Sequence, residues 1–353
     1  MIVSFYDETF KGLQDNASLV VDNSSYSLIK RAVDLDDLKC RCEAFTENIQ
    51  PTFLVIKNDR GNYMYGALAG VPQLNAENQT EITASDLKTM FKSDVLLDFS
   101  KEDNIGSDVN ELFLKVFSEW NEQVNQGSFL CELGFNANVG TIAFDYLKPS
   151  AEHTAVYDVW EDIFSVYLKY YGLFMTSQID LVNKKVIFSI GKSMLKNKNI
   201  KLWEMGKSDY GKWIADVNET QGFVLNTATG ESASGPLWIL TPDNKITSEP
   251  ANRKIYPIKR RIVLKETDDS SAVAALINEA SQEALEELTK SMFQENLELE
   301  NIEADFETRF NLYMLRGDEE PYKSLPCGEL HYDTNGLVKV QVGFRITGIE
   351  FIL

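Results

Sequence analysis

The chain has 353 residues and a formal net charge of −20 at pH 7, from 54 acidic and 34 basic side chains. Hydrophobic residues make up 44% and charged residues 25%, which is ordinary for a soluble globular protein, and the length predicts two or three domains. The charge argues against a surface that grips nucleic acid by neutralising phosphates, because such a surface needs clustered Lys and Arg. Solubility is the simplest explanation of the acidity, although an acidic surface can also line a conduit through which nucleic acid slides.

Targeting and redox signals are few. The amino terminus, MIVSFYDETF, has no basic region followed by a long apolar one, and no run approaches the roughly 20 apolar residues of a membrane span. We therefore expect a soluble protein made in a cytoplasm, with no membrane span. The four cysteines are expected to be reduced and structural, since no zinc-ligand spacing is present; they are Cys40, Cys42, Cys131 and Cys327.

Residues 1–100 are predicted to form a β-rich domain with a mainly antiparallel sheet, because no long helix separates its strands. Between 85 and 91 a short helix places Leu87, Met90 and Phe91 on one face. A β-ribbon that closes on itself around one short helix is typical of a small β-barrel, and it suggests a scaffold rather than a catalytic site. The expected strands span 2–7, 18–22, 26–31, 38–42, 52–57, 63–71, 79–83 and 94–99.

The pattern changes at a polar linker over 101–107, and residues 101–200 are predicted to form a small α+β module. Asp108 is placed to cap a helix that continues to Trp120 with apolar residues at helical spacing. A Gly- and Asn-containing segment follows over 127–140. A second helix is predicted over 155–171, and then come two strands of a hairpin, over 173–181 and 185–190.

Residues 201–353 are predicted to form a second β-barrel domain that contains one long helix over 272–293. The polar run Asp268–Ser271 is a strong start signal for that helix. The complete fold expected is therefore α+β and mainly β, with two small β-barrel domains and an α+β insert between them. The strands expected in the last part span 212–217, 222–226, 236–240, 255–264, 296–302, 310–315, 328–332 and, in two parts, 337–353.

No catalytic, cofactor-binding or metal-binding residue is assigned from the sequence. A serine-hydrolase elbow and the common phosphate-binding loops are absent, and the two histidines, His153 and His331, each stand alone. A calcium loop between Asp98 and Asp108 fails in register, which leaves only a surface calcium site open. The aromatic residues of the 155–171 helix could form a carbohydrate platform, but their helical spacing favours a core position; they are Trp160, Tyr167, Tyr170 and Tyr171.

The order of these elements resembles the baseplate hub, or tail-associated (Tal), proteins of phages with long non-contractile tails, which are similar in fold to the hub protein of T-even phages. The resemblance covers nearly all of the chain and is carried by structural patterns. They are FYDETF and LVVDNSSYSLIKR near the amino terminus, FLVIK with YMYGALAGV, TEITASDLKTMFKSDVLLDF, the long stretch from VYDVWED to NKKVIFSI, the helix over 272–293, and the closing LVKVQVGFRITGIEFIL.

The resemblance implies a structural virion protein and no enzyme. It implies a homotrimer whose paired barrels form a pseudo-sixfold ring that docks on the hexameric distal tail protein, closes the tail tube and opens for DNA ejection during host attachment. The tape-measure protein and receptor-binding proteins would be further partners, and DNA would pass without specific binding. The protein would be assembled in the host cytoplasm and reside at the tail tip. Some family members carry carboxy-terminal domains that degrade peptidoglycan, and this chain stops before such a region.

Two other functions are weighed against this one. The aromatic and acidic residues are also compatible with a tail protein that binds or cleaves cell-wall carbohydrate. A metal-assisted hydrolase is the weaker alternative, since two histidines and scattered cysteines offer few ligands.

Overall fold

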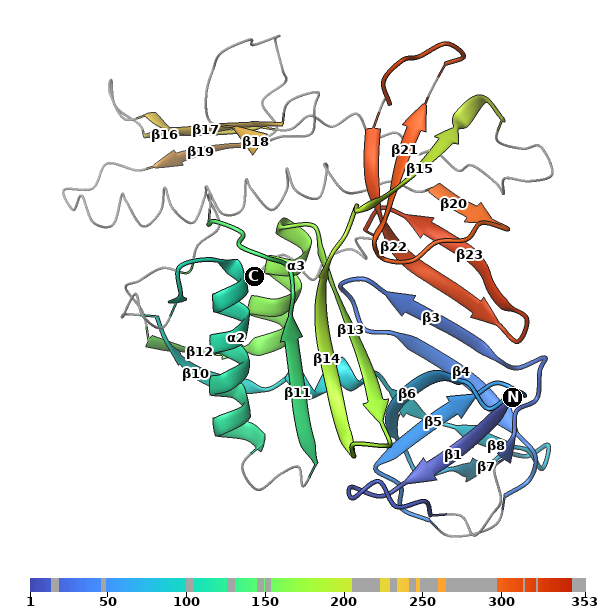
Figure 1. Cartoon of the computed structure of the whole chain (residues 1–353). Helices are drawn as coiled ribbons and strands as arrows, with labels where there is room; N and C mark the ends of the chain where they lie inside the picture. Colours follow the sequence, from blue (N-terminus) through green and yellow to red (C-terminus); the bar gives the residue numbers. More distant parts are fainter. Residues whose placement is uncertain are drawn as a thin grey trace.

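The fold consists mainly of β-strands with few helices (Figure 1), which confirms the expected class. It is seen in a computed structural model. The residues that the structure describes are 1–13, 19–45, 49–99, 105–125, 131–144, 149, 154–204, 223–228, 234–240, 246–247, 260–264, 297–313, 315–321 and 323–344.

A five-stranded antiparallel sheet opens the chain, as the sequence predicted for this region. Its central strand is buried on both faces. Leu54 and Ile56 face one hydrophobic core, whereas Phe53 and Val55 face another, so the unbroken apolar run is explained by two packing partners. The order is β2 (Leu19–Val20), β1 (Ile2–Tyr6), β5 (Phe53–Lys57), β6 (Tyr63–Ala69) and β9 (Ala84–Ser85).

A nine-stranded sheet joins segments from the two ends of the chain. The pairing of β22 with β3 is antiparallel and sets Leu330 opposite Lys30. Strands from the first and last hundred residues therefore share one continuous sheet. Its main order is β15 (Lys196–Lys201), β21 (Thr308–Tyr313), β22 (Lys323–Asp333), β3 (Ser27–Arg31), β4 (Asp37–Cys42), β8 (Thr80–Ile82) and β7 (Gln73–Leu74), and β23 (Gly336–Val342) joins β22 to β20 (Leu297–Glu300).

The middle of the chain combines short sheets with helices, as expected. The helix α2 (Val109–Trp120) is capped by Asp108, whose carboxylate accepts the backbone N–H of Glu111 at 2.9 Å, as the sequence predicted. The predicted hairpin is β13 (Leu173–Asp180) and β14 (Lys185–Lys192). The strand β11 (Glu132–Ala137) pairs parallel with β14. It lies within the Gly- and Asn-containing segment, where the sequence predicted no strand.

The predicted helix over 155–171 is wrong in its first part. Residues Thr154–Asp158 form the strand β12, which pairs antiparallel with β10 (Asp94–Asp98). The Asp158 carboxylate then accepts the N–H of Glu161 at 2.8 Å and so caps a π-helical turn, η3 (Val159–Phe164), that continues into the helix α3 (Ser165–Tyr170). The cap lies four residues later than the apolar spacing alone indicated.

Other predicted elements are shorter or lie elsewhere. The short helix of the first hundred residues is a 3₁₀ turn, η1 (Leu87–Phe91), capped by Asp86. A four-stranded sheet has the order β18 (Ile246–Thr247), β17 (Ser234–Leu240), β16 (Phe223–Ala228) and β19 (Arg260–Leu264). The predicted strand over 212–217 and the predicted helix over 272–293 lie outside the described residues.

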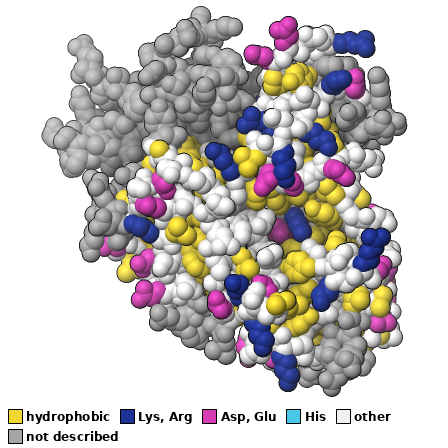
Figure 2. All heavy atoms as spheres, viewed as in Figure 1, with side chains coloured by type: hydrophobic (Ala, Val, Ile, Leu, Met, Phe, Trp, Pro, Cys, Tyr) yellow, Lys and Arg dark blue, Asp and Glu magenta, His cyan; other side chains and the backbone are white. Residues whose placement is uncertain are grey.

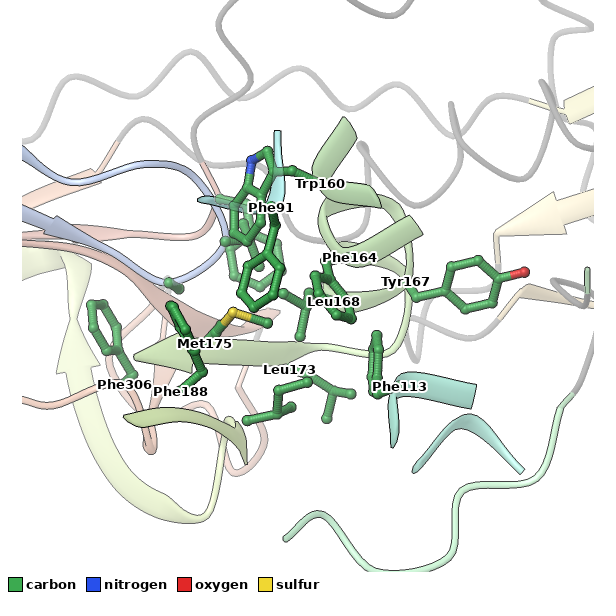
Figure 3. Packing of buried hydrophobic residues seen from close by; sticks show 14 of the residues in the cluster. Phe91, Phe113, Trp160, Phe164, Tyr167, Leu168, Leu173, Met175, Phe188 and Phe306 are labelled. Carbon is green, nitrogen blue, oxygen red and sulfur yellow. The ribbon is translucent and has the colours of Figure 1, made fainter. Parts of the chain in front are cut away.

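An aromatic cluster joins η1 to the elements of residues 101–200, and Phe91 of η1 lies within it (Figure 3). Its ring centroid is 4.7 Å from that of Trp120, 4.8 Å from that of Phe164 and 4.6 Å from that of Phe188. All four side chains are fully buried. Since edge-to-face aromatic pairs add to the gain from burying their area, this cluster fixes η1 against α2, η3 and β14.

Candidate functional site

The connection between β3 and β4, residues 32–36, lies where three parts of the molecule meet. The backbone N–H of Ala32 donates to the carbonyl of Gly328 in β22 at 2.9 Å, and its carbonyl accepts the N–H of Met175 in β13 at 2.9 Å. This one residue therefore ties the amino-terminal strands to both the insert and the carboxy-terminal strands. We call the ionisable side chains around this connection the buried junction; they are Arg31, Asp34, Asp36, Asp86, Lys88, Lys169, Glu329 and His331.

Lys88 is the centre of the buried junction, and its side chain is 1% exposed. Its Nζ lies 3.1 Å from Oδ1 of Asp36 and 3.1 Å from Oδ2 of Asp86. It also donates to the backbone carbonyls of Asp34 at 2.6 Å and Arg31 at 3.2 Å. A buried ammonium is tolerated only with such partners, because an isolated charge would lose its hydration without compensation.

The two aspartates are held in turn by the backbone. Oδ1 of Asp36 accepts the N–H of Arg31 at 2.8 Å, and Oδ2 of Asp86 accepts the N–H of Asp36 at 2.7 Å. Burial and the Asp86 carboxylate raise the pKa of Asp36 to about 6. Burial lowers the pKa of Lys88, but the carboxylates of Asp36 and Asp86 outweigh it, so the net shift is upward and the ammonium stays charged.

Glu329 of β22 forms a second part of the buried junction. The carboxylate of Glu329 lies 3.0 Å from Nε of Arg31 and 2.9 Å from Nε2 of His331, and its side chain is 4% exposed. Burial raises the pKa of Glu329, but the bonds to His331 and Arg31 outweigh burial and hold it below its usual range. On the side of α3, Nζ of Lys169 lies 3.0 Å from Oδ1 of Asp34.

These groups bind one another, and together they form an electrostatic clamp between three segments. The Lys88 ammonium and the carboxylate oxygens named above all contact other protein groups, an arrangement that fixes the positions of these groups. On the face that Figure 2 shows, basic and acidic side chains lie scattered among one another and no broad basic patch is visible. Within the described residues, no group of three or more His, Cys, Asp or Glu side chains is arranged to hold a metal ion.

The residues weighed from the sequence fall in different places. His331 belongs to the buried junction, whereas His153 lies outside the described residues. The four cysteines are free and buried, and burial raises the pKa of Cys327. In the proposed aromatic platform Trp160 is 2% and Tyr167 is 4% exposed, so both are core residues, and Tyr170 and Tyr171 are half-buried.

Part of the calcium-loop region also lies outside the described residues. Asp98 accepts a hydrogen bond from the Thr154 hydroxyl at 2.7 Å, and Asp108 caps α2.

Sequence reasoning missed Lys88, Asp36 and Asp86. The available signals were a lysine inside the short apolar helix and an acidic run over 34–37, but nothing local indicated that the two meet. No helix in the described part of the chain is long and apolar enough to cross a membrane.

Comparisons with known proteins bear on the fold. No protein-family model matches the chain, and no curated protein matches it in sequence. The crystal structure of the prophage tail protein gp18 from Listeria monocytogenes EGD-e is similar, with a TM-score of 0.53 at 8% identity over 99% of this chain and 96% of gp18. The chain thus has the fold of a phage tail protein, which confirms the fold class that the resemblance implied.

Two further structures are more distant. The 43 kDa tail protein of prophage MuSo2 from Shewanella oneidensis gives a TM-score of 0.46 at 12% identity over 98% of this chain and 96% of that one. A chain of the Francisella PdpA–VgrG complex gives 0.47 at 10% identity over 100% of this chain and 54% of that one.

Proposed function

We propose that this chain is a structural subunit of a phage-type tail and that it forms the hub at the tail tip. The observation that carries the proposal is the likeness in fold to the Listeria prophage tail protein, which spans 99% of this chain and 96% of that one. Because fold alone does not establish function, the motif order described from the sequence is the second support. The protein would be assembled in the host cytoplasm and would reside in the virion.

In this proposal three copies form a ring that docks on the hexameric distal tail protein. Each copy contributes two β-barrel domains, residues 1–100 and 201–353, and an α+β insert over 101–200. The connection between β3 and β4 supports this arrangement, because the backbone of Ala32 bonds to both β13 and β22 and so would hold the parts of each copy in a fixed orientation. Receptor-binding proteins and the tape-measure protein would be the further neighbours.

The ring would close the tail tube and open for DNA during host attachment. With −20 on each chain, three copies carry 3 × −20, or −60, and part of this charge would face the lumen. Repulsion between like charges would keep the DNA backbone from adhering to the wall during its passage.

The proposed role is non-enzymatic. The ionisable groups of the buried junction pair with one another, which suits a clamp better than an active site. A carbohydrate-binding or carbohydrate-cleaving role has less support, because Trp160 and Tyr167 lie in the core and offer no ring to a sugar.

Immunogold labelling of purified particles tests the location. Antibodies against the purified chain are applied to particles induced from the strain that carries the gene, and the labelled particles are viewed by electron microscopy. The proposal predicts gold at the tail tip only. Gold along the tail shaft or on the capsid, or particles without label whose protein content lacks the chain, would contradict it.

A further inference from the structure

The centre of the buried junction places one amine between two carboxyl groups. Nζ of Lys88 lies 3.1 Å from Oδ1 of Asp36 and 3.1 Å from Oδ2 of Asp86. The side chains of Lys88 and Asp86 are 1% exposed, and that of Asp36 is 10% exposed. An amine held in this way against a carboxyl group has the proximity that amide formation requires, because the two groups need no encounter by diffusion.

Aromatic side chains exclude water from this centre. The ring centroid of Trp160, which Figure 3 labels, is 5.8 Å from Nζ of Lys88, and Trp160 is 2% exposed. Tyr65 is 3% exposed, and its hydroxyl donates a hydrogen bond to the Asp36 carboxylate. In bulk water an excess of solvent favours hydrolysis of an amide over its formation. A buried site removes that excess, so condensation can become favourable there.

The reaction also needs a neutral amine and a neutral acid. Transfer of one proton from Nζ of Lys88 to the Asp36 carboxylate produces both without changing the total charge of the site. Burial and the Asp86 carboxylate raise the pKa of Asp36 to about 6, which lowers the cost of this transfer. Burial lowers the pKa of Lys88, but the two carboxylates raise it by more, so the ammonium is the resting form and the reaction is slow.

Backbone groups around the two carboxyl groups suit the steps of such a reaction. The N–H of Arg31 donates to Oδ1 of Asp36 at 2.8 Å, and negative charge would develop on this oxygen when the amine attacks Cγ. Asp86 accepts the N–H of Asp36 at 2.7 Å and that of Lys88 at 2.9 Å, which fixes its carboxylate beside Nζ. Asp86 is therefore placed to take a proton from the attacking nitrogen.

We propose that Lys88 and Asp36 condense into an isopeptide bond inside the protein, with Asp86 as the base. Nζ attacks Cγ of Asp36, so that the Nζ–Cγ bond forms and the Cγ–Oδ2 bond breaks. Asp86 takes a proton from the nitrogen and passes it to the departing hydroxyl, which leaves as water.

The step consumes no oxidant, reductant or cofactor, and Asp86 ends as a carboxylate again. Until the bond forms, the junction is the ion cluster described above. The finished bond closes a covalent loop over residues 36–88, which restricts the unfolded chain in the manner of a disulfide. This inference stands independently of the proposed tail function.

Mass spectrometry of the denatured full-length chain tests the inference. The chain is synthesised in a cell-free system, and samples are denatured at intervals. We expect the intact mass to fall with time by the mass of one water molecule. Tandem mass spectrometry of a tryptic digest should then show the peptide with Lys88 joined to the peptide with Asp36. An intact mass that stays at the sequence value, or a water loss located at any other pair of residues, would overturn the inference.

Three variants separate the roles of the groups. Lys88→Arg keeps a cation that stays protonated and is no nucleophile, so its mass should remain at the sequence value. Asp86→Asn keeps the reacting pair but removes the base, so the bond should form about a hundredfold more slowly.

Asp34→Asn is the matched control and should react like the wild type. The Asp34 side chain contacts Lys169 at 3.0 Å, and only its backbone carbonyl contacts Lys88. Circular dichroism checks that the variants are folded. Water loss in Lys88→Arg, or a wild-type rate in a folded Asp86→Asn protein, would overturn the inference.

Discussion

Arg31 and Glu329 are 298 residues apart in the chain, yet Nε of Arg31 lies 3.0 Å from Oε1 of Glu329. The contact joins β3 to β22, the two strands that unite the amino-terminal and carboxy-terminal segments in one sheet. Beside it lies Lys88, whose ammonium holds the Asp36 and Asp86 carboxylates. The buried junction therefore sets the relation between distant parts of the chain, and its residues give the sharpest tests of the fold.

Replacement of Lys88 by Met should strongly destabilise the protein. The variant leaves the Asp36 and Asp86 carboxylates buried without their cation, a loss that typically costs about 3–5 kcal/mol. Chemical denaturation followed by circular dichroism measures the change in the free energy of unfolding. Lys92→Met is the matched control, because Lys92 forms a half-exposed ion pair with Glu161 and its loss should cost about 0–1 kcal/mol. Similar costs for the two variants would show that Lys88 is no clamp.

The stability contribution of Asp36 should depend on pH. Its pKa is about 6 in the folded protein against an ordinary value of 3.8. Between these values the folded chain binds more protons here than the unfolded chain, so this contribution falls as the pH rises through the interval. Relative to Asp36→Asn, the wild type should therefore gain unfolding free energy as the pH falls from about 7 to about 4. Urea titrations of both proteins across this range check it, and a constant or shrinking difference would contradict it.

Gly328 should not tolerate a side chain. A Cβ at this position would lie 1.9 Å from the carbonyl oxygen of Gly343, at the irregularity where β22 and β23 change register. Because the obstacle is backbone, relief requires a shift of the strands, and we expect Gly328→Ala to cost about 1–3 kcal/mol. Gly12→Ala is the control, since a Cβ there meets nothing within 4 Å. Thermal unfolding of the two variants gives the comparison, and equal melting temperatures would refute the close approach.

Local sequence patterns were sufficient to predict a helix or strand where a single segment carries the whole signal for that element. The apolar run of β5 and the Asp108 cap of α2 are visible in the sequence and appear in the structure where expected. β12 was missed because its apolar residues continue the spacing of the following helix, and only pairing with β10 makes it a strand. β11 contains Gly134 and Asn136, which favour loops, and is held by parallel pairing with β14.

The buried junction could not be predicted either, because it too depends on contacts between segments that are distant in the sequence. The sequence shows Lys88 as a polar residue in a short amphipathic turn, and an exposed position is the ordinary expectation for lysine. Its burial follows from the chain segment over 31–36, which supplies two carbonyls and a carboxylate from more than fifty residues away. Such a site depends on tertiary structure that no local period encodes.

The mass of the purified protein in solution tests the central claim most directly. One chain weighs 40.0 kDa, so a threefold hub should give three times that value, about 120 kDa, by native mass spectrometry and light scattering. A threefold annulus should then be visible in averaged electron micrographs of the same sample. A species that stays at 40.0 kDa at high protein concentration would contradict the proposed hub.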